Sequence, residues 1–188
     1  AASQATRSKP IVLLKSGGTE AGARAASSHT GALAGSDVAF DAAFRQSGVI
    51  RAAGVEELFD AAMTFSGRKL PDGNRLLIIT NAGGPGILAA DTAERIGVKL
   101  PQMTKGTLDA LIKQLPPSAS VYNPVDLIGD ATSERYASAL EKAVADPNVD
   151  GVLVILTPQA MTDVDNVADL AIRTAATTEK PILTSFMG

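Results

Sequence analysis

The sequence predicts an α/β fold made of two units, each built around a mainly parallel sheet. Short apolar runs typical of buried strands alternate with amphipathic stretches of about ten or more residues that are typical of helices. A polar, turn-rich stretch from Gly67 to Asn74 interrupts this alternation, and the pattern restarts after it. Hydrophobic residues make up 45% of the chain but aromatic residues only 4%, so the core must consist of Ala, Val, Ile and Leu. Such residues suit helices packed closely on a parallel sheet.

The first unit, residues 1–68, contains few strand signals. The expected elements are a strand over Ile11–Lys15, a helix over 21–26, a helix over Asp37–Gln46, a weak strand at Val49–Ile50 and a helix over Val55–Phe65. Ser36 and Gly48 are the expected cap and stop of the middle helix. Leu58, Phe59, Ala62 and Met63 are expected to face inward from the last one. One good strand and one weak strand are too few for a complete unit, so we expect this unit to be incomplete.

The second unit, residues 74–188, shows a fuller alternation of strands and helices. Expected strands are Leu76–Thr80, Gly151–Leu156 and Pro181–Phe186. Expected helices are Gly86–Ile96, Thr104–Leu115 with Thr104 as its cap, Ser133–Ala145 and Val164–Thr174. Because strands and helices alternate along the chain, this unit is predicted to be α/β with a mainly parallel sheet.

The single histidine of the chain, His29, lies in a run of small residues from Ser27 to Ser36. Small residues such as Ser27, Ser28, Thr30 and Gly31 let the backbone approach a ligand and supply N–H and O–H donors for phosphate oxygens. The neutral, nucleophilic form of imidazole is well populated near pH 7. We therefore interpret His29 as a phosphoryl acceptor, the alternative being a histidine on a surface loop. Residues 27–35 are expected to form a mobile loop that becomes ordered on phosphorylation.

A second group of candidate residues follows the strand expected at Leu76–Thr80. The residues are Asn81, Ala82, Gly83, Gly84, Pro85 and Gly86. Pro85 suits a first helical turn, and the glycines leave the N–H groups of that turn open to an anion. The alternative is a tight turn whose glycines serve only the backbone. The spacing is neither that of a Walker A loop nor that of a Rossmann fingerprint. Further along, Asn123–Leu127 is interpreted as an extended X-Pro segment in which Asp126 caps a turn.

Composition and charge exclude several classes of function. The net charge is −3 and no basic run is present, which argues against nucleic acid and anionic membranes as partners. With no cysteine and one histidine, disulfides, thiolate chemistry and an ordinary zinc site are not expected. No apolar run approaches the roughly 20 residues of a membrane span. We expect a soluble cytoplasmic protein with no metal site of its own.

The segments 27–36, Asn81–Gly86 and Asn123–Leu127 together resemble the ADP-forming (NDP-forming) acyl-CoA synthetases, or acetate–CoA ligases, of the succinyl-CoA synthetase superfamily. The segments occur in the order found in that family, and the resemblance extends over nearly the whole chain. One departure is Gly18, where an arginine is common in the family. Its absence removes one possible anion contact.

The resemblance implies two flavodoxin-like subdomains. Residues 1–68 would be the C-terminal part of the domain that bears a phosphohistidine, and residues 74–188 a second succinyl-CoA-ligase-like domain. His29 would be the catalytic residue. The phosphate-binding residues would be Ser27, Ser28, Thr30, Gly31, Asn81, Ala82, Gly83, Gly84 and Gly86.

The resemblance also implies a reaction and partners. His29 would take phosphate from an acyl phosphate made from acyl-CoA and phosphate, and would pass it to ADP in an ATP-grasp domain or subunit. The complete enzyme, expected to be an oligomer with a CoA-binding domain, would use CoA, ADP or ATP, Mg and phosphate. None of these is expected to bind tightly to this segment alone. The alternative function is a non-catalytic, acyl-CoA-sensing module of a protein acetyltransferase fusion.

Overall fold

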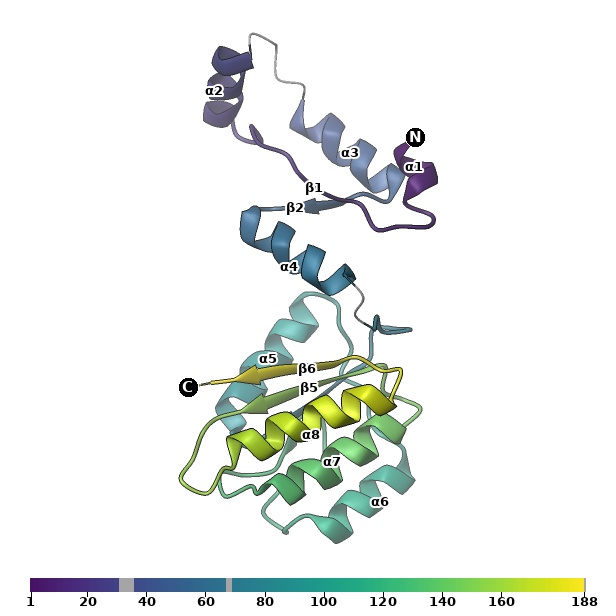
Figure 1. The fold of residues 1–188 in the computed structure, drawn as a ribbon, viewed down its shortest axis with the longest axis vertical. Helices are drawn as coiled ribbons and strands as arrows, with labels where there is room; N and C mark the ends of the chain where they lie inside the picture. Colours follow the sequence, from purple (N-terminus) through teal and green to yellow (C-terminus); the bar gives the residue numbers. More distant parts are fainter. Residues whose placement is uncertain (31–35, 67–68, 188) are drawn as a thin grey trace. The chain divides into compact units, whose positions relative to one another are not determined.

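The computed structural model describes residues 1–30, 36–66 and 69–187. The chain divides into two compact units, Ala1–Arg68 and Lys69–Gly188, which are described one at a time (Figure 1).

The first unit contains a small parallel sheet of two strands. Its elements are α1 (Ala2–Ala5), β1 (Val12–Leu14), α2 (Glu20–Thr30), α3 (Asp37–Ser47), β2 (Ile50–Ala52) and α4 (Val55–Phe65). The strands pair from Val12 with Ile50 to Leu14 with Ala52. Helix α3 ends as predicted at Gly48, whose φ of 72° lies in the left-handed region that glycine adopts without strain.

The inward face predicted for α4 is wrong for Phe59, Ala62 and Met63, which are exposed, and right only for Leu58. Phe59 and Met63 are 64% and 62% exposed, whereas Leu58, Ala61 and Phe65 are half-buried. The inner face therefore follows positions 58, 61 and 65, which share one side of a helix. A sheet of two strands covers only a narrow strip of the helix, so the wider apolar surface of α4 stays exposed.

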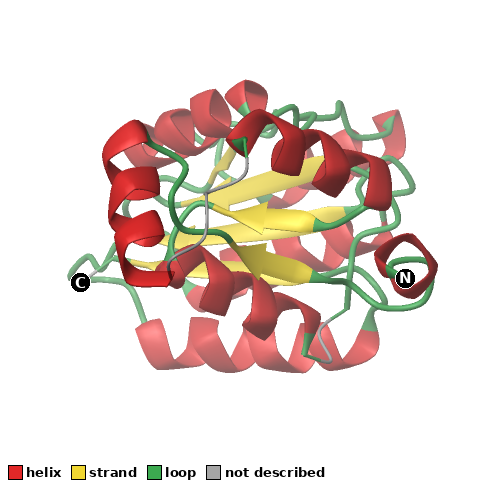
Figure 2. Ribbon diagram, turned by 90° about the horizontal axis from the view of Figure 1, so that it is seen from above, coloured by secondary structure: helices red, strands yellow, loops and turns green. Residues whose placement is uncertain are grey.

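The second unit is a four-stranded parallel sheet in the order β4-β3-β5-β6. Its elements are β3 (Leu76–Thr80), α5 (Gly83–Arg95), α6 (Lys105–Gln114), β4 (Val125–Asp126), α7 (Ser133–Ala145), β5 (Gly151–Leu156), α8 (Val164–Thr177) and β6 (Ile182–Phe186). The strands, yellow in Figure 2, pair in parallel throughout. The first strand of the unit lies between the second and the third, as in flavodoxin-like sheets. The predicted α/β class with parallel sheets is confirmed.

The core of the second unit lies between the sheet and the helices α6, α7 and α8. Leu77 and Ile79 of β3 pack there against Leu111 of α6 and Leu140 of α7, all of them buried. Alternate strand residues such as Ile78 point to the other face, where α5 lies (Figure 1). The carboxyl ends of β3, β4 and β5 therefore share one edge, from which α5 begins.

A bidentate ion pair joins the amino ends of β3 and β5. Arg75 Nη2 lies 2.6 Å from Asp150 Oδ1, and Arg75 Nε donates to Asp150 Oδ2 at 2.9 Å. The backbone N–H of Arg75 also donates to Asp150 Oδ2 at 3.0 Å. These bonds from Arg75 lower the pKa of Asp150 to about 2.

The Arg75–Asp150 ion pair makes the free energy of unfolding depend on pH in the acid range. Because the pKa of Asp150 is lower in the folded chain than its ordinary 3.8, its stabilisation is full above about pH 4 and is lost as pH falls toward 2. We expect the free energy of unfolding, measured with urea, to fall less between pH 5 and pH 2 in Asp150→Asn than in the original chain. Arg75→Met should do the same, and the double variant should add little more. An unchanged pH dependence in both single variants would contradict this assignment.

Candidate functional site

The histidine segment is helical up to Thr30. Ser27, Ser28, His29 and Thr30 form the last turn of α2, whereas the sequence predicted a loop from Ser27 onward. The alanine-rich stretch before them favours continued helix, and the Ser28 hydroxyl bonds back to the Ala25 carbonyl at 2.8 Å. Gly31 and the rest of the predicted loop, residues 31–35, lie outside the described residues.

Helix α5 begins earlier than predicted, at Gly83 instead of Gly86. Pro85 is thus the third residue of the helix and has no N–H to offer. By helix geometry the N–H groups of Gly83 and Gly84 have no partner within the helix, so they are the donors at its start. The N–H of Gly86, predicted as a further donor, instead bonds the Ala82 carbonyl at 3.3 Å. The N–H of Ala82 bonds Thr80 Oγ1 at 3.0 Å.

The three glycines at this helix start have different surroundings. A Cβ on Gly86 would lie 2.9 Å from Thr80 Cγ2, so glycine is needed there for α5 to approach the sheet. A Cβ on Gly84 would have nothing within 4 Å, and one on Gly83 would lie 3.3 Å from Asp126 Oδ2. Gly86 therefore serves packing, while Gly83 and Gly84 keep the helix start open.

Asn81 contributes a structural bridge rather than a free side chain. The residue is 1% exposed. Its Nδ2 donates to the Thr157 carbonyl at 2.8 Å, and its Oδ1 accepts from the Thr157 N–H at 2.8 Å. These bonds tie the end of β3 to the end of β5, which is where doubly wound sheets commonly bind ligands. Asn81 thus shapes the edge of the candidate site without pointing its amide into it.

Asp126 caps a turn, as predicted, since its Oδ1 accepts from the Ile128 N–H at 2.9 Å. Its other oxygen lies beside Gly83 at the start of α5, a placement that the sequence analysis missed. The parallel pairing of Thr80 with Asp126 brings the two strand ends to one edge and explains this placement. The sequence carried no signal for it, because residues 125–126 were not expected to form a strand. The start of α5 therefore combines free N–H donors with one carboxylate.

Two kinds of feature are absent from the part of the chain that the structure describes. Within residues 1–30, 36–66 and 69–187, no three side chains of His, Cys, Asp or Glu gather as they would around a metal ion. None of the described helices has the length and apolar character needed to cross a membrane.

Comparison with known proteins identifies the family. The model of the succinyl-CoA ligase like flavodoxin domain matches residues 1–65, and that of the Ligase-CoA domain matches residues 76–188. The chain belongs to the Ligase-CoA domain family. The resemblance inferred from the three sequence segments is thereby confirmed.

Relatives of this Ligase-CoA domain chain are ADP-forming ligases. Acetate–CoA ligase (ADP-forming) I of Archaeoglobus fulgidus is 49% identical over 86% of this chain and 23% of its own length. The alpha subunit of acetate–CoA ligase (ADP-forming) II of Pyrococcus furiosus is 43% identical over 99% of this chain and 41% of its own. The solved structure of dinucleotide-forming acetyl-coenzyme A synthetase 1 of Ca. Korarchaeum cryptofilum, in complex with phosphate and ADP, matches with a TM-score of 0.88. That match is 36% identical and covers 100% of this chain and 41% of the other. The chain thus spans less than half the length of these relatives.

Proposed function

We propose that this chain is the phosphoryl-carrier portion of an NDP-forming acyl-CoA synthetase, with His29 as the phosphate acceptor. The complete enzyme would convert acyl-CoA, ADP and phosphate into a carboxylic acid, ATP and CoA. The observation that carries the proposal is the match of the whole chain to ADP-forming ligases, in a sequence whose single histidine lies in a donor-rich segment.

Two transfers would pass through His29. In the first, a neutral ring nitrogen attacks the phosphorus of an acyl phosphate, an N–P bond forms and the carboxylate leaves. In the second, a β-phosphate oxygen of ADP attacks the same phosphorus and the N–P bond breaks. We propose that a CoA-binding domain and an ATP-grasp domain or subunit outside this chain supply the other substrates. We propose that Mg²⁺ would enter with the nucleotide there.

The phosphate on His29 needs donors from another element. His29 lies in the last turn of α2, the helix end at which carbonyl groups point outward and which does not favour an anion. The start of α5 has the opposite character, because Gly83 and Gly84 present free N–H groups at the positive end of a helix. We propose that this helix start holds the phosphate during transfer, with Ser27, Ser28, Thr30 and Gly31 as further donors.

Asp126 should weaken phosphate binding at that helix start. Its carboxylate lies beside Gly83, where it repels an anion. We expect Asp126→Asn to lower the KM for phosphate about three- to tenfold in the complete enzyme, because it removes one charge and keeps the oxygen that accepts from Ile128. Steady-state kinetics at varied phosphate concentration measures the effect. A higher KM in a variant of normal stability would contradict it.

Assay of the complete enzyme containing this chain tests the proposal. With acyl-CoA, ADP and phosphate, we expect ATP formation coupled one-to-one to CoA release. CoA binding without ATP formation, together with transfer of an acetyl group to a protein lysine, would contradict the proposal and favour the acetyltransferase-associated module.

A further inference from the structure

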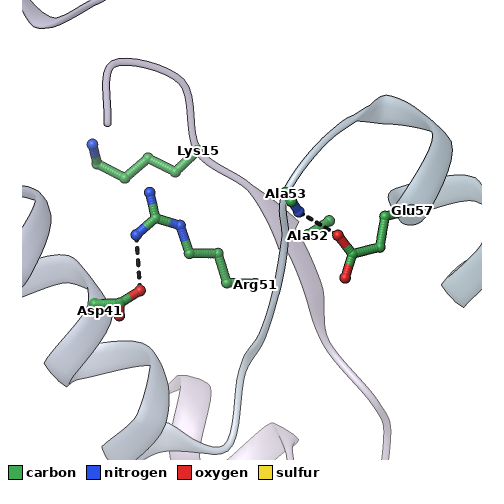
Figure 3. A pocket seen from close by; sticks show the side chains of 6 residues that line it. All are labelled: Lys15, Asp41, Arg51, Ala52, Ala53 and Glu57. Atoms are coloured by element: carbon green, nitrogen blue, oxygen red, sulfur yellow. Dashed lines mark hydrogen bonds and ion pairs between the residues drawn. The ribbon is translucent and has the colours of Figure 1, made fainter. Parts of the chain in front are cut away.

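Arg51 is the centre of a charged network at the carboxyl ends of β1 and β2. Its Nη2 and Nη1 lie 2.7 and 3.0 Å from the two carboxylate oxygens of Asp37, the first residue of α3. Nη1 also donates to Asp41 Oδ1 at 2.8 Å, the bond drawn in Figure 3. Lys15, directly after β1, lies 3.2 Å from Asp37 Oδ1. The side chains of Lys15, Arg51 and Asp37 are 14%, 25% and 32% exposed, so the network is largely shielded from water.

The network lies where the histidine segment leaves the sheet and where it returns. The outgoing chain passes so close that a Cβ on Gly18 would lie 3.2 Å from Arg51 Nη2 and 3.4 Å from the oxygens of Asp37. The returning chain enters α3 at Asp37 itself. Gly18, just before α2, and Asp37, the first residue of α3, therefore meet at the Arg51 guanidinium. We call the stretch of chain between these two residues, which carries α2 and His29, the excursion.

We propose that Arg51, paired with Asp37, is a clamp at the neck of this excursion and a positioning residue for His29. Two parallel N–H···O bonds from a planar guanidinium fix both the separation and the orientation of the partners. Joining the two ends of the excursion reduces the number of conformations open to residues 19–30, and with them the positions that His29 can take. The role in transfer rests on the proposed function, whereas the clamping of the excursion does not.

Arg51→Met, Arg51→Lys and Asp37→Asn in the complete enzyme test the clamp. Arg45→Met is the matched control. Arg45 lies on α3, as Asp37 does, but its side chain is 83% exposed and pairs with Asp41 one turn away. The readouts are the single-turnover rate of His29 phosphorylation, the KM for ADP, the Tm, and amide hydrogen exchange over residues 19–30.

We expect Arg51→Met to slow phosphorylation of His29 about tenfold or more. The KM for ADP should stay within about twofold of the wild-type value. Exchange over residues 19–30 should become faster, while exchange in β3 and β5 stays unchanged. Arg51→Lys should recover part of the rate because it keeps the charge without the fork, and Arg45→Met should behave as the unmodified enzyme.

An unchanged rate and unchanged exchange in Arg51→Met would overturn the clamp. A loss explained entirely by a lower folded fraction, judged from the Tm and from Arg51→Lys, would overturn it as well. If the unmodified enzyme forms no phosphoenzyme, the proposed function fails. The clamp is then decided by exchange alone, with faster exchange over residues 19–30 supporting it and equal exchange rejecting it.

Discussion

Replacing His29 with alanine should abolish phosphoenzyme formation and lower ATP synthesis by about three orders of magnitude or more. No other histidine exists in the chain, and the sequence has no cysteine that could accept phosphate in its place. Alanine is the best helix former, so the last turn of α2 should persist. Labelled phosphate incorporated from ATP, followed with stopped assays, measures the effect.

Ser28→Ala is the matched control for His29→Ala. In the original chain the Ser28 hydroxyl donates to the Ala25 carbonyl within the same helical turn, and a serine at that position contributes little to helix stability. If Ser28 adds only a phosphate donor, the control should keep labelling and lose rate by about tenfold or less. Labelling that survives in His29→Ala at the level of the unmodified enzyme would disprove the carrier role of His29.

Gly84→Val should reduce phosphoenzyme formation by about 10²-fold while leaving the chain folded. A side chain on Gly84 meets no atom within 4 Å, so the fold accepts it. The same side chain projects from the start of α5 and shields the N–H donors there. Removal of one preorganised donor to a transition-state oxygen costs about 10²–10³ in rate. Rapid-quench labelling, together with urea unfolding, separates the two effects.

Gly86→Ala should instead lower the stability of the chain and leave phosphoenzyme formation by the folded protein unchanged. The added Cβ would lie 2.9 Å from Thr80 Cγ2 and 3.5 Å from Pro124 Cβ, so α5 or β3 must shift. Overpacking of this kind costs about 1–3 kcal/mol of unfolding free energy.

Normal phosphoenzyme formation in Gly84→Val would mean that the start of α5 does not hold the phosphate.

The strongly patterned elements were predictable from sequence. β3, β5, α4 and α7 have the bounds that were expected, and Thr104 caps α6 through its side chain as expected. Each has a clear apolar period or a recognisable cap, so local sequence decides its extent. The start of α5 was placed late because glycine is a poor helix former, whereas Gly83 and Gly84 precede Pro85 within the first turn of the helix.

The errors and omissions concern tertiary structure. The inner face of α4 depends on how much sheet lies beneath it, which a helical period does not reveal. The side-chain contacts of Asn81 and Arg51 could not be predicted from sequence, because their partners Thr157 and Asp37 are distant along the chain and are brought near by the fold. These contacts became visible only with the fold.

Peptide mapping of the complete enzyme after incubation with acyl-CoA and phosphate, without ADP, tests the central claim most directly. Phosphate trapped in the absence of its acceptor should lie on the peptide that contains His29, as an acid-labile N–P bond, and should disappear when ADP is added. Turnover with no phosphate on that peptide, or with phosphate on a different residue, would contradict the account.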